Sequence, residues 1–446
     1  MGVNPAIHRV RSRKREMEAD VWVVEFPLWD LPNRQMRVGD EIERAIHKMR
    51  LKCTTPGEYE IFFWDTGLRH RYHMVSGGDP NVAPAASTVA TASARKVRDV
   101  VEDAVYQTAR DILTAPNVAG LESVWRSLRW FTEQCPAAAG IQLEVLDCTS
   151  DSAFQAMEGV SVEEDFAEPD LFALVDGPGE SAWSEVALFA ENRMAPCLMG
   201  LPSTLGALEG DALIEYLSAA TGSESDERLA LRADEGSRWL AIAHNPIVMF
   251  QEGAGALQRF VLASPVWGIL GALGASYAST GSFARITGQP GQLRVPGMHT
   301  LSSGKESGVG IPTLHFTSIR AQTELAALGV IAIGSPRNSD RMALAAVPQY
   351  RNSRDALLPA QIWTGRIVRF AKWVQGQLPA GSSSEEAREI FEQAGAVFLY
   401  PGTGQAAKIT AEISGEGEAR MLNIGARMDG SLALIPLQIE FSLPLR

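Results

Sequence analysis

The feature that most constrains the fold is an alternation of strand-like and helix-like runs in the middle of the chain. Leu171–Val175 and Ala195–Gly200 have the pattern of strands, and Trp183–Glu191 between them has the pattern of a helix. Strand–helix–strand order with short connections is typical of parallel strands joined by a crossover helix. The sequence therefore predicts an α/β (mixed α+β) fold: a mixed β-sheet flanked by helices, with a small N-terminal α+β segment and C-terminal strands.

Further runs of both kinds continue on either side of this region. Apolar residues at helical spacing indicate helices over 97–112, Leu121–Cys135, Leu257–Phe283, Ala321–Leu328, Leu358–Gln377 and Ser384–Ala394. Alternating or β-branched runs indicate strands over Ile141–Asp147, Trp239–His244, Thr313–Ser318, Val330–Ile333, Ala407–Ser414, Met421–Arg427 and Leu432–Leu443. The chain thus closes with two helices and three strands.

The beginning of the chain is separate in composition. Strand-like runs at Val21–Trp29 and Tyr59–Trp64 flank an amphipathic run at Gly39–Lys52. Residues 76–94 are rich in Gly, Pro, Ala, Ser and Thr, which is the composition of a flexible linker. A length of 446 residues also suits more than one domain. We therefore expect a segment 1–80, a linker 81–94 and a core 95–446 with parts at 95–135, 141–334 and 356–446.

Composition narrows the classes of function. The net charge of −13 argues against a nucleic-acid-binding protein, because phosphate backbones select basic surfaces. The four cysteines form no C-x-x-C pair, so neither a zinc knuckle nor a disulfide framework is indicated, and a reducing, cytoplasmic location is expected. The most apolar stretch, 260–283, is diluted by Gly, Ser, Thr and Pro. It predicts a buried helix rather than membrane insertion.

The acidity is concentrated in one part of the chain. Residues 151–235 hold nineteen acidic and three basic side chains, a net charge of −16, so the remainder is slightly basic. One interpretation is a surface that meets a basic partner or another copy of the chain, with Arg9–Arg15 as a candidate counterpart. The other is a solvated face that keeps the protein soluble. The sequence leaves both interpretations open.

The chain lacks the common motifs of catalysis. The run Gly304-Lys305-Glu306 does not fit a phosphate-binding loop, which needs Ser or Thr after the lysine. His70 and His73 lie among arginines, which disfavour a metal ion, and His244 ends an apolar strand as core histidines do. We therefore expect no enzyme activity, no cofactor and no metal site.

One stretch carries a family resemblance. Residues 112–129 read ILTAPNVAGLESVWRSLR: a helix ends, a proline turn follows, and the next helix carries the pattern Leu-Glu-x-x-Trp-Arg. This resembles the large subunit of the type VI secretion contractile sheath (TssC-like or VipB-like). The matching residues are Leu121, Glu122, Trp125, Arg126 and Leu128. We expect Leu121, Trp125 and Leu128 to pack inward, and Glu122 and Arg126 to pair across one helical turn.

Further blocks resemble the same family in the same order. Residues 232–240 are similar to a strand entry of the family and include Arg238, and Trp267-Gly268 resembles a helix start. The strongest block is 317–333 (TSIRAQTELAALGVIAI), where the matching residues are Arg320, Glu324, Leu328 and Gly329. Arg369 lies in another block, Leu358–Trp373. The resemblance covers residues 97–446 and leaves 1–80 unmatched.

The resemblance implies a structural role. Family members pair with a small sheath subunit (TssB-like) and with further copies of themselves in a helical tube. The tube surrounds an Hcp-like inner tube and transmits contraction. Baseplate proteins and a ClpV-type ATPase act with the assembly. Members also exchange terminal arms that add strands to neighbouring sheets. The candidate interface residues here are Val21, Val23, Glu25, Ile439, Phe441 and Leu443. The alternative is a non-contractile relative that acts as a baseplate, adaptor or shell protein.

Overall fold

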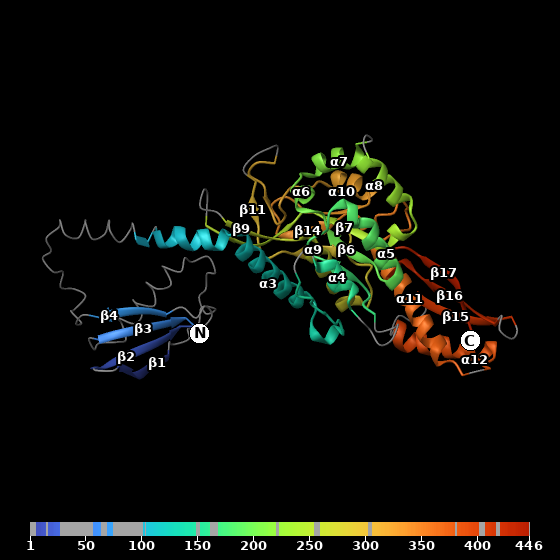
Figure 1. Ribbon diagram of the computed structural model, residues 1–446, viewed down its shortest axis with the longest axis horizontal. Helices are drawn as coiled ribbons and strands as arrows, with labels where there is room; N and C mark the ends of the chain where they lie inside the picture. The colour runs from blue at the N-terminus through green and yellow to red at the C-terminus, as the bar shows by residue number, and fades with distance from the viewer. Residues whose placement is uncertain are drawn as a thin grey trace. The chain divides into compact units, whose positions relative to one another are not determined.

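The structure of the chain is a computed structural model (Figure 1). It describes the strands at 6–14, 17–26, 57–63 and 69–74 and the helix start at 223–225 by their backbone. It describes fully residues 101–102, 104–148, 152–160, 168–219, 226–253, 259–301, 306–379, 381–400, 406–415 and 420–445. The chain divides into two compact units, Met1–Arg110 and Asp111–Arg446, and each is described by itself.

The unit Met1–Arg110 contains a four-stranded sheet. Its strands lie in the order β1 (Ala6–Lys14), β2 (Met17–Phe26), β3 (Gly57–Phe63) and β4 (Arg69–Met74). β2 runs antiparallel to β1 and parallel to β3, and β4 runs antiparallel to β3. β2 and β3 correspond to the two strands that the sequence predicts. The apolar pattern does not predict β1 and β4, because basic residues and histidines fill much of both.

Two consecutive helices correspond to the helical pair that the sequence predicts. One spans 101–114, with residue 103 not described, and α3 (Pro116–Gln134) follows after a break at Ala115. Pro116 occupies the first turn of α3, where its missing N–H leaves no helical hydrogen bond unmade. The predicted helix Gly39–Lys52 and the linker 81–94 lie outside the described residues.

A six-stranded sheet is the centre of the unit Asp111–Arg446. Its order is β10 (Leu293–Arg294), β14 (Arg341–Leu344), β13 (Val330–Gly334), β7 (Leu240–His244), β6 (Cys197–Gly200) and β5 (Phe172–Leu174). The four strands from β5 to β13 are parallel, and β14 and β10 are antiparallel to their neighbours. The mixed sheet confirms the predicted α/β fold class.

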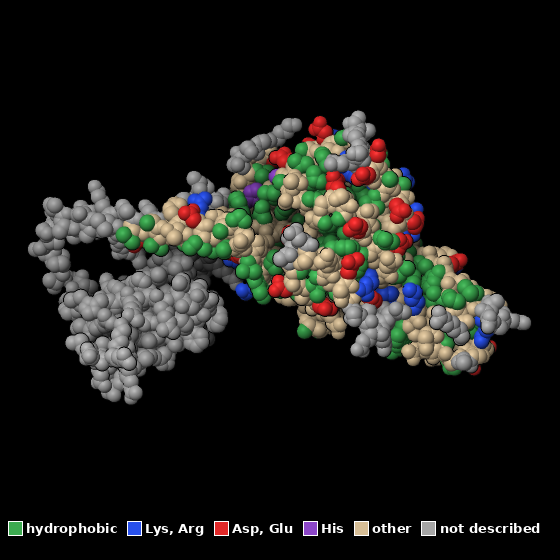
Figure 2. All heavy atoms as spheres, viewed as in Figure 1, with side chains coloured by type: hydrophobic (Ala, Val, Ile, Leu, Met, Phe, Trp, Pro, Cys, Tyr) green, Lys and Arg blue, Asp and Glu red, His purple; other side chains and the backbone are tan. Residues whose placement is uncertain are grey.

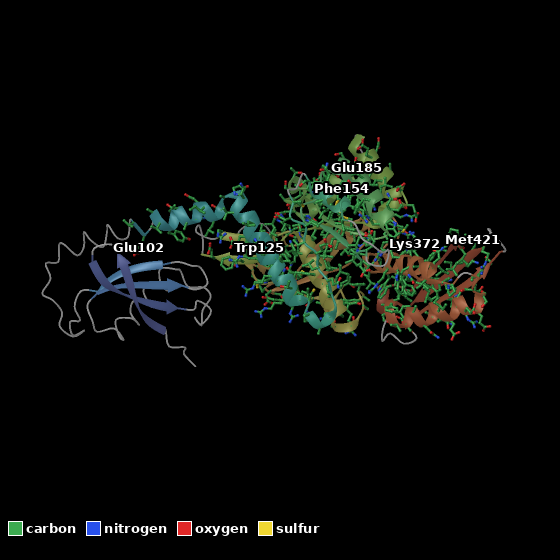
Figure 3. The ribbon with its side chains drawn as sticks, turned by 60° about the horizontal axis from the view of Figure 1, so that its bottom comes forward. Glu102, Trp125, Phe154, Glu185, Lys372 and Met421 are labelled. Atoms are coloured by element: carbon green, nitrogen blue, oxygen red, sulfur yellow. The ribbon has the colours of Figure 1, made fainter. Side chains whose placement is uncertain are left out.

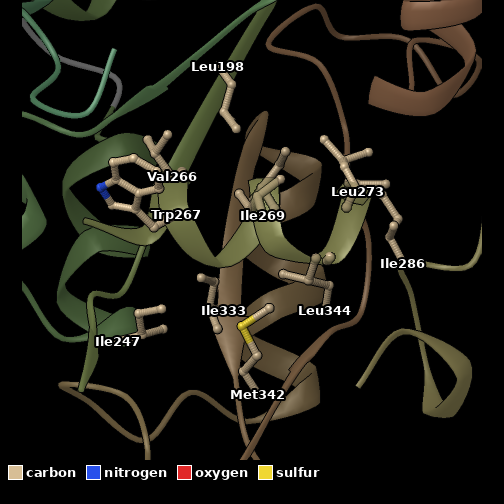
Figure 4. Packing of buried hydrophobic residues seen from close by; sticks show 14 of the residues in the cluster. Leu198, Ile247, Val266, Trp267, Ile269, Leu273, Ile286, Ile333, Met342 and Leu344 are labelled. Atoms are coloured by element: carbon tan, nitrogen blue, oxygen red, sulfur yellow. The ribbon is translucent and has the colours of Figure 1, made fainter. Parts of the chain in front are cut away.

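Helices cover both faces of this sheet. On one face, α5 (Trp183–Arg193), α7 (Gly210–Ser218) and α10 (Ile319–Ala327) share a buried core with Leu240 and Ile242 of β7. On the other face, α3 and α9 (Pro265–Thr280) share a core with Ala241 and Ala243. Figure 4 shows Trp267 and Ile269 of α9 packed in this second core beside Ile333 and Met342. Successive side chains of β7 therefore point alternately into two hydrophobic cores, one on each face of the sheet.

Several predicted elements of this unit differ from the structure. The helix predicted over Leu257–Phe283 begins only at Pro265, because residues before it pair as a hairpin of β8 (Ile247–Glu252) and β9 (Arg259–Ala263). The predicted strands Ile141–Asp147 and Thr313–Ser318 form no named strand. The first has no main-chain partner among the described residues, and the second makes only an isolated bridge between Thr313 and Ile247 of β8.

The end of the chain forms a small helix-and-sheet module. α11 (Leu358–Gln377) and α12 (Ser384–Ala394) pack on the antiparallel sheet β15 (Ala407–Ser414), β16 (Met421–Met428) and β17 (Leu437–Pro444). Both helices and β15 have the predicted bounds. The predicted strand Leu432–Leu443 is wrong in its first part, where α13 (Gly430–Ala433) makes a helical turn and Leu434 has a positive φ of 71°.

The outer edge of β15 is occupied within the chain at Ile413. The N–H of Ile413 donates to the hydroxyl of Ser384 at the start of α12, at 2.9 Å. Because Ile413 opposes Leu422 of β16 in the ladder, this bond occupies the side of β15 that faces away from the sheet.

The remaining elements are short and complete the connections of the unit Asp111–Arg446. They are η2 (Ala137–Ala139), α4 (Ala153–Glu158), η5 (Glu180–Ala182), α6 (Ser203–Gly206), α8 (Ser223–Ala233), η6 (Gly236–Trp239), η8 (Gln289–Gly291), β11 (His299–Thr300), β12 (Gly310–Ile311) and the π-helix η9 (Gly395–Leu399). None of the helices in the described residues is long and apolar enough to span a membrane.

Candidate functional site

Helix α3 is joined to the β8–β9 hairpin by a charged network. Glu122 accepts hydrogen bonds from Arg126 Nε at 2.8 Å and from Arg259 Nη1 at 2.7 Å. Arg259 is buried and also pairs with Glu252 across the hairpin. Burial raises the pKa of Glu122, but the hydrogen bonds and charges of the two arginines outweigh it, so the pKa lies below its ordinary value. The expected pair of Glu122 and Arg126 is present, and Arg259 completes it.

Sequence reasoning missed Arg259, although a signal for it exists. Glu252 and Arg259 flank a Gly-Ala-Gly-Ala run, and the hairpin register places them opposite each other. Charges of opposite sign around a glycine-rich turn are a pattern typical of hairpins. The guanidinium of Arg126 also lies over the ring of Phe250 on β8, 3.9 Å from its centre. The network therefore combines ion pairs with a cation–π contact.

The outward face of α3 is apolar, which corrects a prediction. Trp125, labelled in Figure 3, is 64% exposed and Leu121 is 60% exposed, so neither packs inward. Of the three predicted residues, Leu128 alone is half-buried. The buried face carries Ser127 and two aromatic residues, Trp130 and Phe131. Small serines bring the helix close to the hairpin, as the bond from Ser123 Oγ to the carbonyl of Leu262 at 2.6 Å shows. The helix is thus turned so that Trp130 and Phe131 face the core, while Leu121 and Trp125 face outward.

Exposed apolar residues concentrate in one part of the unit Asp111–Arg446. Among the described residues of this unit, eight of the fourteen exposed large hydrophobic side chains lie between residues 111 and 148. They are Ile112, Val118, Leu121, Val124 and Trp125 around α3, and Leu143, Val145 and Leu146 in the segment after it. A concentration of this kind typically marks a protein–protein contact. We call residues 112–125 of this set the α3 apolar surface.

Other residues of the family-like blocks lie at joints between elements. Arg238 of η6 donates to Gln361 of α11 at 3.1 Å and pairs with Glu235 at 2.7 Å. Arg369 of α11 is buried and pairs with Asp170, just before β5, at 2.6 Å. Burial lowers the pKa of Arg369 even with Asp170 beside it.

The block around α10 combines a surface pair with a backbone requirement. Arg320 and Glu324 pair with each other at 2.7 Å on the exposed side of α10. Leu328 ends the helix, half-buried, and Gly329 then has a φ of +83°. A side chain at Gly329 would begin 2.8 Å from the carbonyl oxygen of Tyr350, so both the conformation and the space require glycine.

Trp267 is a core residue of the layer between α3 and α9. Its ring centre lies 6.1 Å from that of Phe131 on α3. The structure thus brings Glu122 and Arg126 together, with Trp267 in the adjoining core. Arg238, Arg369 and the α10 residues lie at separate joints. The predicted residues do not form one cleft.

The acidic part of the chain is divided between internal pairs and an outer layer. Four of its carboxylates bind arginines inside the unit: Glu168 with Arg193, Asp170 with Arg369, Glu180 with Arg228, and Glu235 with Arg238 and Arg351. Figure 2 shows other acidic side chains over the layer of α5, α7 and α8. Part of the local acidity is therefore used to hold the fold together.

The two groups of candidate interface residues lie on different kinds of strand. Val21, Val23 and Glu25 are on β2, which has a neighbour on each side: Val23, for example, faces His8 of β1 and Glu60 of β3. In contrast, β17 with Ile439, Phe441 and Leu443 pairs with β16 alone among the described strands. These three side chains are half-buried against the core of the C-terminal module. Of these two strands, β17 is the one with an open edge.

Comparisons with known proteins give distant structural similarities. No family model matches the chain, and no curated protein matches it. The contracted sheath of an extracellular contractile injection system (PVC) is similar at 11% identity and a TM-score of 0.40, over 73% of this chain and 77% of that chain. The anti-feeding prophage baseplate is similar at 14% identity and a TM-score of 0.35, over 72% and 76%. A sheath tail protein of Listeria innocua is similar at 9% identity and a TM-score of 0.36, over 68% and 61%.

Proposed function

We propose that the chain is a structural subunit of a contractile, type VI secretion-like sheath. The observation that carries the proposal is where the family-like blocks lie in the unit Asp111–Arg446. Glu122 joins α3 to the β8–β9 hairpin, Arg369 joins α11 to the start of β5, and Gly329 lets β13 begin beside Tyr350. Family-like residues at contacts between elements support a core shared with the sheath family, because such residues determine how the elements pack.

In this proposal the chain assembles in the cytoplasm with a small sheath subunit (TssB-like) and with further copies of itself. The resulting helical tube surrounds an Hcp-like inner tube. It starts at baseplate proteins and is dismantled by a ClpV-type ATPase. The chain acts without catalysis: it passes a change of packing from one subunit to the next.

Two surfaces of the described residues support an assembling role. The α3 apolar surface exposes Leu121 and Trp125, which a permanent partner would cover. The edge of β17 offers backbone groups for strand addition. Both are contacts between proteins rather than sites for a small molecule.

Electron microscopy after co-expression with a small sheath subunit tests the proposal. We expect helical tubes from the pair. A Trp125→Glu variant should lose the small subunit in a pull-down, because a charge on this exposed position blocks an apolar contact without disturbing the core. Leu229→Glu, at a similarly exposed position on α8, is the matched control and should keep the small subunit. Isolated monomers from the wild-type pair in every condition would contradict the proposal.

A second candidate is a non-contractile baseplate, adaptor or shell protein. The unit Met1–Arg110 favours it, because its four-stranded sheet lies in the part of the chain that the family resemblance does not cover. Closed rings that never lengthen, in the same microscopy experiment, would select this candidate.

A further inference from the structure

Residues 141–148 are a strand-like segment without a sheet. The sequence IQLEVLDC alternates in its first five residues, and the segment contains no helix, turn or bend. Among the described residues no backbone hydrogen bond between main-chain groups involves it. The side chains of Leu143, Val145 and Leu146 are exposed. Unpaired backbone groups and exposed apolar side chains together define a strand that needs a neighbour.

The segment is packed against the fold at its first residue. Ile141 Cδ1 lies 4.0 Å from the point where a side chain of Gly274 on α9 would begin. Further along the chain, Met157 of α4 is buried in the core that covers the other face of the central sheet. Residues 141–148 therefore lie between two packed positions of the sequence, unlike a terminal arm.

The edge of β17 has open hydrogen-bonding groups at known positions. The N–H of Leu445 donates to the carbonyl of Arg420, which extends the register in which Met421 opposes Pro444. Bonded positions alternate along an antiparallel pair. Gln438, Glu440 and Ser442 therefore direct their N–H and C=O groups away from β16. Pro444 lies two residues after Ser442, so its carbonyl also points away from β16, and there it accepts a hydrogen bond from Gln375 Nε2.

The two segments have matching side-chain patterns. Residues 141–145 read IQLEV and residues 437–441 read LQIEF, so both follow the order apolar, Gln, apolar, Glu, apolar. On β17 the apolar residues face the core of α11 and α12, and Gln438 and Glu440 are exposed. A strand 141–148 beside β17 would place Leu143 and Val145 on that apolar side and Gln142 and Glu144 on the polar side.

We propose that residues 141–148 of one copy of this chain add as a fourth strand to the outer edge of β17 in a second copy. The second copy is the occupant because the chain carries both the unpaired strand and the unpaired edge, and the two do not pair within one chain. This inference rests on the proposed function, because a sheath needs a repeating contact between copies of its subunit. The contact can be measured on the purified full chain without a small sheath subunit.

Two variants break the two sides of the contact. Val145→Asp puts a charge on the apolar side of the added strand, at a position that is 58% exposed and so leaves the core intact. Glu440→Pro removes an outward N–H from β17 without touching the ladder to β16. Leu229→Asp, also at 58% exposure, and Glu440→Ala, which keeps the N–H, are the matched controls.

Sedimentation velocity at rising concentration is the measurement. We expect the wild type and both controls to associate, and each of the two variants to associate at least tenfold more weakly. An equal mixture of the two variants should form dimers, because Val145→Asp keeps an intact β17 edge and Glu440→Pro keeps an intact segment 141–148. Circular dichroism of each variant checks that the fold is kept.

Three results overturn the inference: a wild type that stays monomeric, variants that associate like the wild type, or a mixture that forms no dimer. If the copies instead associate through the α3 apolar surface, both variants should associate like the wild type. The outcome is distinct from that of the proposed function. If tubes form with a small subunit but the mixture of variants gives no dimer, the sheath role is kept and this contact is excluded. If the mixture gives dimers but no tubes form, this contact is kept and the sheath role is excluded.

Discussion

At the scale of single residues, the glycines of α9 set the spacing between helix and neighbours. A side chain at Gly271 would begin 2.7 Å from the ring of Trp130 on α3. One at Gly268 would begin 2.7 Å from Ile333 of β13, and one at Gly274 would meet the sulfur of Cys135. α9 therefore approaches both the sheet and α3 at distances that only glycine permits, which is why the predicted Gly- and Ala-rich helix is buried.

Gly271→Ala should destabilise the fold by roughly 1–3 kcal/mol, because the rigid Trp130 ring cannot move aside easily. Gly120→Ala in α3 is the control: nothing lies within 4 Å of its added carbon. It should instead stabilise the helix by about 0.5–1 kcal/mol. Urea unfolding of both variants provides the measurement, and equal effects would count against this account of α9.

His244 makes a second prediction at the same scale. It is fully buried at the end of β7, and neither ring nitrogen has a hydrogen-bond partner among the described residues. Burial, with a smaller effect of His315, lowers the pKa of His244 to about 3. The unfolded chain therefore binds a proton near pH 6.5 while the folded chain does not. Stability is unaffected above that pH and falls as the pH drops from 6.5 toward 3.

The variant His244→Leu removes the titrating group and loses no hydrogen bond. Between pH 7.5 and pH 4.5, the wild type should lose about 2–3 kcal/mol more unfolding free energy than the variant. Urea titrations at the two pH values give this difference. Identical losses in both proteins would show that His244 is not the source of acid sensitivity.

At the scale of elements, the pairing of α3 with the β8–β9 hairpin depends on Glu122. Glu122→Gln leaves Arg259, which is buried, with one carboxylate instead of two. We expect a loss of about 1.5–3 kcal/mol. Glu133→Gln breaks an exposed pair with Arg129 at the same helical spacing and should cost less than about 0.5 kcal/mol. Thermal unfolding compares the two, and a similar small loss in both would mean that burial adds nothing here.

Element bounds follow from the sequence where a local signal marks them. α12 begins with a capping box of Ser383 and Glu386, and α11 has a proline in its first turn, and both helices have their predicted ends. The inward face of α3 could not be predicted in the same way. An apolar residue that awaits a partner, such as Trp125, has the same spacing as one in the core, so periodicity alone assigns it inward.

At the scale of the whole molecule, the charge of the acidic layer makes a prediction about assembly. Glu168, Asp170, Glu180 and Glu235 are neutralised within the fold, and the exposed carboxylates over α5, α7 and α8 remain. If these meet a basic partner, assembly should weaken as ionic strength rises from about 0.05 to 0.5 M, because exposed charges are screened over this range. Light scattering measures it. Unchanged scattering would leave the layer a solvating face.

The fold class and the order of elements could be predicted for the unit Asp111–Arg446, because hydrophobic periodicity reports burial. Which residues meet could be predicted only over short distances, as for Glu122 with Arg126. The pairing of Glu122 with Arg259 joins positions 137 residues apart. It depends on how the hairpin packs against α3, and no local pattern encodes this.

The hydroxyl of Ser384 has a consequence for growth. By accepting the N–H of Ile413, it occupies part of the β15 margin of the C-terminal sheet, and the inferred contact then extends the sheet at the β17 margin. Each subunit then accepts one incoming strand from another copy. A row of such subunits has two unlike ends, one with an empty β17 margin and one with a free segment 141–148. A small amount of the Glu440→Pro variant should therefore halt elongation at one end and leave the other growing.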